Sequence, residues 1–465
     1  MAKLRAIHTA ELLKEVSGRF PQHDALVHVQ RGISYSYREF AQAVDQLAKG
    51  LLGLGIGKGE HIAIWATNLP EWAIAMFAIA RVGGVMVSVD PSYQANQVEY
   101  LLRQSDSQTL IFTKGVKGDE FLRILLDLAP EIKGSKPGGL NSPRFPQLKN
   151  LILISDAPSP GVFLWGEVLQ KGEDIPSRAL QKRAKECQPD DVFSLLYTSG
   201  TTGPPKGVMS THYALINKSI ASAEFQQLSQ KDRLCLPIPL FHMFGCICVL
   251  LTAVACGATT VIPSDVFDPT MTLRALQEEK CTALYGAPSL FISLLEHPNF
   301  DDFNLSSLRT GIIGGSPCPL EVMKEIVGRM GVREITIGYG ATEASSWITQ
   351  TKTDDPIEVR VSTIGRACPN IEVKIVDPNT GQELPDGVQG ELCTRGLLMK
   401  GYYKMPAATA KAIDQDGWLH TGDLGQRDSK GFFKITGRLK EVINKKGQII
   451  YPVEIEEFLY THPKI

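Results

Sequence analysis

The sequence lacks the marks of several protein classes. Its 48 basic and 50 acidic residues almost cancel, so bulk charge favours neither nucleic acid nor an anionic membrane surface as a partner. Its nine cysteines include no C-x-x-C pair and no metal-ligand spacing, which gives no sign of a redox or zinc motif. Five of them stand in largely apolar or strand-like segments and are expected to be reduced, buried thiols: Cys235, Cys246, Cys248, Cys256 and Cys281.

The sequence also predicts neither a targeting segment nor a membrane span. Residues 1–20 mix acidic with basic side chains and hold no apolar core or cleavage site, which predicts a cytoplasmic protein. The run Met243–Ile262 carries no charge and approaches the length of a membrane span. Gly257–Thr260 breaks it, so we expect a buried helix that ends near Ala255 and a strand that begins near Thr259.

The length and composition predict a multidomain globular protein with a large buried core. The chain has 465 residues, whereas a typical domain holds about 100–200. Between Tyr35 and Phe112, helical patterns alternate with short apolar runs, which predicts parallel α/β layering. The expected helices are Tyr37–Leu54, Pro70–Val82 and Asn96–Ser105, and the expected strands are His61–Trp65, Val85–Val89 and Thr109–Phe112.

The rest of the chain divides into segments that differ in composition and in the spacing of apolar residues. Lys114–Lys149 is rich in Gly, Pro and Lys and is expected to be a surface loop or insertion. A second α/β stretch follows, with strands expected at Val192–Tyr197, Thr259–Ile262, Ala283–Tyr285, Thr310–Ile313 and Glu334–Ile337. Ile348–Ile435 holds short β-rich runs between turn signals, and Val453–Leu459 resembles an opening helix. We therefore expect units at 1–190, 191–345 and 346–438, then a hinge and a further start at 439–465.

Tyr197–Gly207 reads Tyr-Thr-Ser-Gly-Thr-Thr-Gly-Pro-Pro-Lys-Gly and follows an apolar strand. Its glycines, Gly200 and Gly203, let backbone N–H groups approach phosphate oxygens, and Lys206 supplies charge. Its hydroxyl donors are Thr198, Ser199, Thr201 and Thr202. The plain alternative is a solvated hairpin loop. The P-loop of GTPases and ATPases is excluded, because two prolines precede Lys206 and a glycine follows it.

This segment resembles the signature loop of the adenylate-forming enzymes, which include acyl- and aryl-CoA ligases, firefly-type luciferases and the amino-acid-activating domains of peptide synthetases. Further segments in that family's order extend the resemblance from Thr9 to the end of the chain. Glu334–Ile465 looks most like medium-chain acyl-CoA synthetases. The resemblance implies a large N-terminal domain of two α/β subdomains plus a small β-rich barrel subdomain, followed by the start of a small α+β domain.

The second family segment is Pro239–Gly245. By resemblance, His242 lies beside the acyl carboxylate and the pantetheine path, and Phe241 and Gly245 help to line the acyl pocket. A lone histidine before an apolar run is otherwise more often a core residue. Peptide-synthetase domains carry an aspartate near here for the substrate's amino group, and none stands in this segment. The substrate is therefore expected to be a simple carboxylic acid.

The third family motif has two parts, Ile313–Pro317 and Gly338–Glu343, each directly after an expected strand, where open α/β sheets bind ligands. The resemblance implies these roles: Gly315, Ser316 and Tyr339 around the adenine, Thr342 at the α-phosphate, Glu343 on Mg²⁺, and Gly338 and Gly340 at the acyl pocket. Carboxylate oxygen suits Mg²⁺. Glu343 alone could equally be an exposed turn residue.

The last family segments are His420–Leu424 and Thr436–Glu441. By resemblance, Asp423 accepts both ribose hydroxyls, Arg438 reaches the same ribose, and Lys440 is the hinge between the large and small domains. Many relatives continue with Ile-Lys, whereas this chain has Asn444 after the isoleucine. Lys445 and Lys446 are displaced by one or two positions, so no lysine role is carried over to them.

The resemblance implies catalysis in two steps with ATP, Mg²⁺ and coenzyme A. A carboxylate attacks the α-phosphorus of ATP and releases pyrophosphate, and CoA then displaces AMP. Lys206, Thr342, Glu343 and His242 are the expected catalytic residues. Acetate-using relatives carry Trp at the place of Gly340, so medium-chain or aromatic acids are expected to be preferred.

Two alternatives stay open: a ligase with a non-CoA acceptor, and a weakly catalytic adenylate-binding protein. The partners expected are small molecules, with no nucleic acid and either a monomer or a dimer. Relatives continue past the hinge by about 50–100 residues. We therefore expect this chain to bind ATP or acyl-AMP but to form acyl-CoA more slowly than a longer version.

Overall fold

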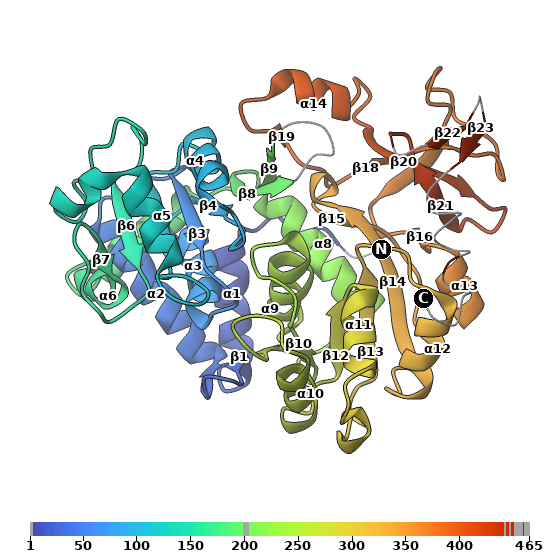
Figure 1. The fold of residues 1–465 in the computed structure, drawn as a ribbon, viewed down its shortest axis with the longest axis horizontal. Coiled ribbons are helices and arrows are strands. Elements are labelled where there is room, and N and C mark those ends of the chain that lie inside the picture. The colour runs from blue at the N-terminus through green and yellow to red at the C-terminus, as the bar shows by residue number, and fades with distance from the viewer. Residues whose placement is uncertain (1–2, 199–203, 441–442, 446–447, 451–458, 460–465) are drawn as a thin grey trace.

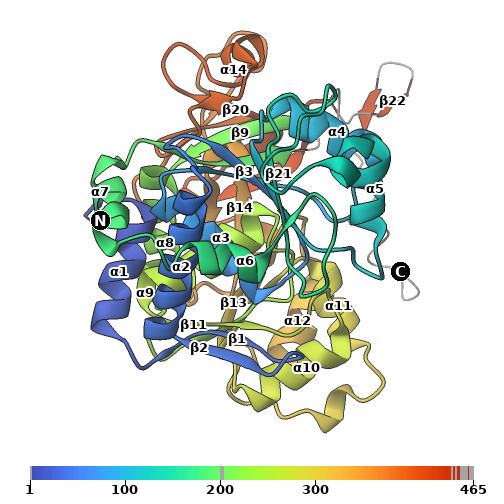
Figure 2. The same cartoon turned by 90° about the vertical axis from the view of Figure 1, so that its left-hand side faces the viewer.

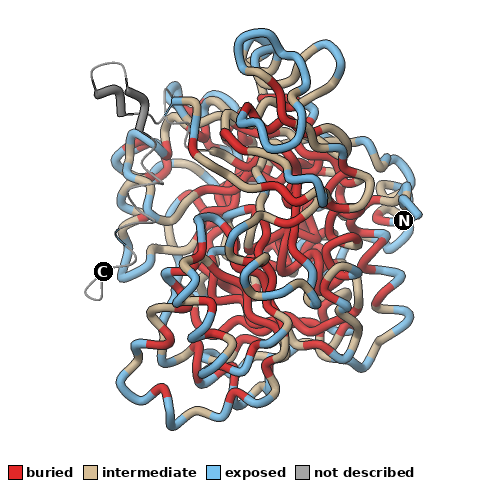
Figure 3. Tube along the Cα trace, turned by 90° about the vertical axis from the view of Figure 1, so that its right-hand side faces the viewer, coloured by how far each residue is buried: buried red, intermediate tan, exposed pale blue. Residues whose placement is uncertain are grey.

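The computed structural model describes residues 3–198, 204–440, 443–445, 448–450 and 459. They form two large sheets, a smaller antiparallel sheet, and helices that separate and cover them (Figure 1). Buried backbone gathers in the middle of the molecule, and exposed backbone follows the outer loops (Figure 3). Each helix in this part of the chain is too short or too polar to cross a membrane. The expected α/β fold class is confirmed.

The first sheet has eight strands in the order β19-β9-β8-β4-β3-β5-β6-β7. They are β3 (His61–Trp65), β4 (Val85–Ser88), β5 (Thr109–Phe112), β6 (Asn150–Leu153), β7 (Phe163–Leu164), β8 (Val192–Thr198), β9 (Lys206–Thr211) and β19 (Gly401–Tyr402). Strands β3 to β8 pair in parallel. The exceptions are the β8–β9 hairpin and the β9–β19 pair, which are antiparallel.

The second sheet has nine strands in the order β16-β15-β14-β13-β12-β10-β11-β1-β2. They are β1 (Asp24–His28), β2 (Ile33–Ser36), β10 (Arg233–Cys235), β11 (Thr259–Ile262), β12 (Ala283–Gly286), β13 (Thr310–Gly314), β14 (Glu334–Ala341), β15 (Ser346–Gln350) and β16 (Arg366–Ala367). Its centre is parallel, so the carboxyl ends of β12, β13 and β14 meet at one edge.

A layer of helices lies between the two sheets (Figures 1 and 2). It contains α1 (Thr9–Arg19), α2 (Tyr37–Gly53), α3 (Pro70–Arg81), α8 (His212–Phe225) and α9 (Thr252–Cys256). Helix α3 contacts β1 of the second sheet and β3 and β4 of the first, and α8 contacts β9 and β15. A helix covered on both sides should be apolar all round, and Glu71 is the one residue of α3 between Pro70 and Ala80 that is not buried.

Local signals explain where these helices begin. The Ser36 side chain accepts from the Glu39 N–H, and the Glu39 carboxylate accepts from the Ser36 N–H at 2.8 Å, which is a capping box at the start of α2. Pro70 occupies the first turn of α3, where its missing N–H costs no hydrogen bond. The expected bounds of both helices are confirmed to within one residue.

The outer helices complete the layers. Those near the first sheet are α4 (Ala95–Gln104), α5 (Glu120–Leu128), α6 (Trp165–Lys171) and α7 (Ser177–Glu186). Those near the second are α10 (Pro269–Glu278), α11 (Pro288–Leu295), α12 (Leu320–Gly328) and α13 (Ile357–Ser362). The segment Lys114–Lys149, expected to be a surface loop or insertion, is not a loop throughout, because it contains α5, which buries Phe121 against Trp65 with ring centroids 4.1 Å apart. The Gly, Pro and Lys residues that flank this helix favoured a loop prediction for the segment as a whole.

The expected boundary between residues 190 and 191 does not separate the two sheets. Strands β1 and β2 come from the first forty residues yet complete the second sheet, whereas β8 and β9 follow residue 190 yet belong to the first. Each segment therefore crosses to the other sheet. Composition and the spacing of apolar residues could not predict this, because they report local periodicity and not which strands pair.

The β-rich part forms a four-stranded antiparallel sheet in the order β17-β18-β20-β21. Its strands are β17 (Glu372–Val376), β18 (Gly390–Arg395), β20 (Leu419–Arg427) and β21 (Phe433–Arg438). Between β19 and β20 stands the short helix α14 (Pro406–Ala412), and β22 (Ile443–Lys445) pairs with β23 (Gln448–Ile450). The helix expected at Val453–Leu459 lies outside the described residues except for its last position.

The uncharged run after Met243 is a buried helix and strand, as expected. A π-helix covers Phe244–Leu251, α9 follows it, and β11 begins at Thr259. Gly257 ends α9 with φ 78°, a left-handed conformation that favours glycine. All nine cysteines are free thiols, and all but Cys256 are buried.

Candidate active site

The β8–β9 hairpin carries the expected phosphate loop. Thr198 pairs with Lys206 at the end of the hairpin, while Ser199, Gly200, Thr201, Thr202 and Gly203 lie outside the described residues. Helix α4 holds the flanks of the loop: the Tyr100 hydroxyl donates to the Pro205 carbonyl at 2.9 Å, and the Tyr197 hydroxyl donates to Gln104. The loop therefore starts and ends on fixed backbone.

Thr198 has chemistry that suits an anionic ligand. Its Oγ1 is buried and has no hydrogen-bond partner in the described part of the chain. A buried hydroxyl without a partner costs about 1–3 kcal/mol. A phosphate oxygen at the loop would accept its hydrogen, so the residues present fit the phosphate group of a nucleotide.

Lys206 and Glu343 meet through a tyrosine that the sequence analysis missed. The Lys206 Nζ lies 4.6 Å from the centroid of the Tyr402 ring, and the Tyr402 hydroxyl donates to Glu343 Oε1 at 2.8 Å. Strand β19 places Tyr402 there by pairing with Val208 of β9. Burial, and then the Glu343 carboxylate, raise the pKa of Tyr402 well above its usual value, so it stays a neutral donor. The Lys206 ammonium thus lies over the Tyr402 ring, and the Glu343 carboxylate lies at its hydroxyl.

Tyr339, Asp423 and Arg438 form a second cluster. The Tyr339 hydroxyl donates to Asp423 Oδ2 at 2.6 Å, and Arg438 Nε lies 2.9 Å from Asp423 Oδ1. Asp423 and Arg438 are also paired in the register of β20 and β21. Burial, followed by the Asp423 carboxylate, raises the pKa of Tyr339 well above its usual value. The expected ribose acceptor therefore touches the expected adenine residue.

The remaining adenine candidates lie at the same sheet edge. Gly314 of β13 pairs with Gly338 of β14, so Gly315 and Ser316 follow directly beside Tyr339. Both are exposed. Gly315 has φ +89°, a conformation that side chains rarely adopt, and this explains a glycine there.

Thr342 and Glu343 lie in a strained turn. They form the 3-10 segment Thr342–Ala344 directly after β14. The next two residues, Ser345 and Ser346, have φ values of 56° and 127° although neither is glycine. Such conformations cost about 1–3 kcal/mol each and gather at functional sites. The turn bends the chain between Glu343 and β15.

A buried asparagine positions the His242 segment. Asn68 Nδ2 donates to the Ile238 carbonyl at 2.9 Å, and Asn68 Oδ1 accepts from the Leu240 N–H at 2.8 Å. His242 itself is exposed, and its Nδ1 accepts from the Phe244 N–H at 3.1 Å. In the neutral ring, Nε2 therefore carries the hydrogen.

Gly245 allows the chain to turn back at His242. A Cβ on Gly245 would lie 2.1 Å from the Pro239 carbonyl oxygen, so no larger residue fits. Phe241 is half-buried in the same turn. The turn leads directly into the π-helix, a rare element that is frequent at functional sites.

Trp347 joins the acyl segment to the nucleotide segment and was not singled out from the sequence. Its ring lies 5.2 Å from that of Phe244, nearly perpendicular to it. A Cβ built on Gly338 would meet the Trp347 ring at 2.9 Å, and one on Gly314 would meet it at 3.0 Å. The two glycines thus make room for the indole, whose Nε1 is buried without a partner in the described residues.

Gly340, which is expected to leave the acyl pocket open, also has a backbone reason to be glycine. A Cβ on Gly340 would stand 2.2 Å from the Ser346 carbonyl oxygen, because β14 and β15 approach closely at a register shift there. This glycine is required by neighbouring backbone. The aromatic side chain beside the strand edge is supplied instead by Trp347, from the next strand.

The hinge candidate lies at the end of the β-rich sheet. Lys440 is exposed and lies two residues after the end of β21. Asn444 and Lys445 belong to β22, and Lys446 lies outside the described residues.

The fold and these clusters define a class: a layered α/β protein with phosphate, ribose and acid-binding candidates gathered around the edges of its sheets. The family model described as AMP-binding enzyme matches residues 13–403. The chain belongs to this family.

Curated relatives agree with that assignment, and a solved structure shares the fold. The chain is 48% identical to "Putative acyl-CoA synthetase YngI" of Bacillus subtilis, covering 100% of this chain and 85% of that protein. It is 38% identical to "Medium-chain acyl-CoA ligase ACSF2, mitochondrial" of Danio rerio, covering 98% and 75%. The crystal structure of the anthranilate CoA ligase AuaEII with anthranoyl-AMP superposes with a TM-score of 0.86 at 24% identity, covering 99% and 83%.

Proposed function

We propose that the chain is an AMP-forming acyl-CoA synthetase. It joins a carboxylic acid to ATP, giving acyl-AMP and pyrophosphate, and then transfers the acyl group to the thiol of coenzyme A with release of AMP. The observation that carries the proposal is the placement of Lys206 and Glu343 on one tyrosine beside the β8–β9 hairpin. The 48% identity to a protein named as an acyl-CoA synthetase supports it.

Each cluster has a part in this reaction. Lys206 and the hydroxyls of the hairpin hold the phosphates, and Thr342 donates to the α-phosphate where negative charge develops. The Asp423 carboxylate accepts the ribose hydroxyls, with Arg438 beside it. His242, with its hydrogen on Nε2, donates toward the acyl carboxylate. Catalysis rests on positioning and charge stabilisation, so no covalent protein intermediate is required.

The Glu343 carboxylate fits a magnesium ion. It is a hard oxygen donor, half-buried, with Oε1 oriented by the Tyr402 hydroxyl at 2.8 Å. Bound there, Mg²⁺ would neutralise negative charge on the phosphates of ATP.

The substrate class is a simple medium-chain or aromatic acid. Phe244 and Trp347 offer apolar and aromatic surface next to the His242 turn. The relative from Danio rerio is named for medium-chain acids. Cytoplasmic residence stays a prediction of the sequence.

The test is pyrophosphate release by the purified chain with ATP, Mg²⁺ and one acid at a time: acetate, hexanoate, decanoate or benzoate. We expect release that depends on the acid, and acyl-CoA detected by mass spectrometry when CoA is added. Adenylate formation with no transfer to CoA would point to another acceptor, such as a carrier-protein thiol. Nucleotide binding with no acid-dependent release would indicate an adenylate-binding protein and defeat the proposal.

A further inference from the structure

Opposite Glu391, the β18–β20 ladder is interrupted where the ribose acceptor sits. Glu391 pairs with Leu424 and Cys393 pairs with His420. One residue of β18 therefore stands opposite residues 421–423 of β20, which bulge out of the ladder. Bulges often re-aim a side chain next to an active site. This bulge carries Asp423.

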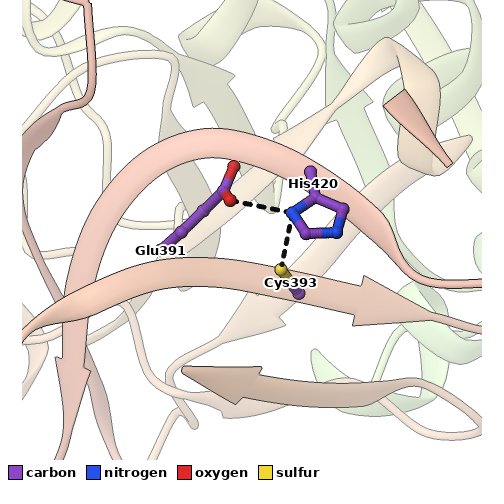
Figure 4. Close-up of side chains that lie close together, drawn as sticks. All are labelled: Glu391, Cys393 and His420. Carbon is purple, nitrogen blue, oxygen red and sulfur yellow. Dashed lines mark hydrogen bonds and ion pairs between the residues drawn. The ribbon is translucent and has the colours of Figure 1, made fainter. Parts of the chain in front are cut away.

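The Glu391 carboxylate replaces the hydrogen bonds that the bulge loses. Its Oε1 accepts from the Gly422 N–H at 3.0 Å, and its Oε2 lies 2.8 Å from His420 Nδ1 (Figure 4). A carboxylate only accepts, so Nδ1 carries the hydrogen. The side chain of Glu391 is 9% exposed. One buried anion thus ties both flanks of the bulge.

The threonine of the bulge adds two further bonds. Thr421 Oγ1 donates to the Leu392 carbonyl at 2.7 Å and accepts from the Asp423 N–H at 3.1 Å. Gly422 has φ +74°, which a non-glycine residue would adopt only with strain. The backbone of Asp423 is therefore fixed from the β18 side, while its carboxylate faces Tyr339 and Arg438.

A metal ion is the other occupant that Glu391, Cys393 and His420 could suggest, since their donor atoms lie within 4.8 Å of one another. The contacts favour hydrogen bonds. Glu391 and Cys393 both approach the same ring nitrogen, Cys393 at 3.4 Å, and the second carboxylate oxygen is used by Gly422. Burial, and then Glu391, raise the pKa of Cys393 to about 12, which agrees with a neutral thiol beside the imidazole in this hydrogen-bonded arrangement.

We propose that Glu391 is a positioning residue for nucleotide binding: its buried carboxylate sets the bulge so that Asp423 meets both ribose hydroxyls. This inference rests on the proposed role of Asp423 as ribose acceptor. Glu391 does not touch the nucleotide, so its effect must pass through the ribose contacts and disappear when these hydroxyls are removed.

The experiment compares ATP with 2′,3′-dideoxy-ATP by calorimetric binding to the purified chain. Glu391→Ala should weaken ATP binding about 10- to 100-fold, the range for a lost bond to a charged group, and should change binding of the dideoxy nucleotide by less than about threefold. Glu391→Gln, which keeps an acceptor for Gly422, should restore most of the affinity. Glu372→Gln is the matched control, because this exposed carboxylate on the neighbouring strand β17 pairs with Arg395 and not with the bulge.

Thr421→Val offers a second variant of nearly the same shape, should Glu391→Ala fail to fold, and the same selective loss is expected from it. An equal loss for both nucleotides, or no loss for either, would overturn the positioning role. Zinc that raises the melting temperature of the wild type but not of Glu391→Gln would overturn it in favour of a metal site. Wild-type protein that binds both nucleotides equally would instead refute Asp423 as the ribose acceptor, while acid-dependent pyrophosphate release would still test the proposed function separately.

Discussion

The Tyr339 hydroxyl donates a 2.6 Å hydrogen bond to Asp423 and thereby connects β14 of the nine-stranded sheet to β20 of the four-stranded sheet. This bond joins two parts of the chain that are 84 residues apart. Because the donor is the residue expected at the adenine and the acceptor is the residue expected at the ribose, the bond sets the spacing between the two candidate subsites.

Removing this hydroxyl should weaken nucleotide binding more than stability. Tyr339→Phe keeps the aromatic ring but leaves Asp423 without one donor, and we expect about a tenfold rise in the Kd for ATP. Calorimetry on the purified variant measures it. Tyr37→Phe is the control, since it removes a similar hydroxyl bond, 2.6 Å to the Ala258 carbonyl, away from the candidate site. Equal losses in both variants would contradict a specific role for Tyr339.

The Lys206–Tyr402–Glu343 cluster should act on phosphate and magnesium handling. Lys206→Ala and Glu343→Gln change half-buried side chains beside a loop, so the melting temperature should move little. We expect the KM for MgATP to rise about tenfold or more, because each variant removes a charge near the phosphates. Pyrophosphate-release kinetics at several Mg²⁺ concentrations provide the readout. If either variant unfolded the protein but its folded fraction bound ATP as tightly as the wild type, the assignment of Lys206 and Glu343 to phosphate and magnesium binding would be wrong.

Trp347 should set the acyl-chain preference, in place of Gly340. In the wild type, hexanoate and benzoate should outcompete acetate, since each buried CH₂ contributes about 0.8 kcal/mol. Trp347→Phe shortens the ring that lies over Gly314 and Gly338, and it should move the optimum toward longer acids. The measurement is kcat/KM for acids of increasing chain length. Trp418→Phe, at a ring covered by Lys374 and Arg395, should leave the profile unchanged, and an unchanged profile in Trp347→Phe would count against this role.

Lys218 should make stability depend on alkaline pH. Burial lowers its pKa from 10.5 to about 8, although Cys368 and Cys248 raise it slightly, and its Nζ donates to the Trp347 carbonyl at 2.5 Å. Between about pH 8 and 10.5 the unfolded chain holds a proton that the native chain has released. The contribution of Lys218 to stability therefore rises with pH in this window, by up to about 1.4 kcal/mol per pH unit. Below about pH 8 the cost of the buried charge is fully present.

Lys218→Met should accordingly be more stable than the wild type at pH 7, and the difference should shrink as the pH approaches 10.5. Denaturant unfolding of both proteins across this range measures it, with exposed Lys324→Met as the control. A constant difference at all pH values would exclude titration of Lys218 as the cause.

The sequence predicted the local elements well where periodicity and turn residues agree. Strands such as His61–Trp65 and Thr259–Ile262 have the expected bounds, because apolar runs that begin soon after a glycine and end before polar or proline residues leave few alternatives. It failed for partners that are distant in the chain. Tyr402 reaches Glu343 only because β19 pairs with β9, almost 200 residues earlier, and no local pattern records this pairing.

The candidate site was predicted as separate motifs, and the structure adds the contacts between them. Asp423, Arg438 and Tyr339 were each expected at a nucleotide, but the bonds that join them depend on how β14 and β20 approach. Gly340 was attributed to the acyl pocket, and the Ser346 carbonyl oxygen, 2.2 Å from where a Cβ would stand, gives a second reason for a glycine there. A small residue in a motif can serve either a ligand or a neighbouring strand, and sequence alone does not separate the two.

Mass spectrometry of the nucleotide recovered from the purified chain after incubation with hexanoate, ATP and Mg²⁺ shows directly whether an acyl adenylate is formed. We expect hexanoyl-AMP, formed only when both the acid and ATP are present and strongly reduced in Glu343→Gln. Recovery of only unreacted ATP or AMP from protein that has bound nucleotide, with every acid tested, would contradict acyl-adenylate formation.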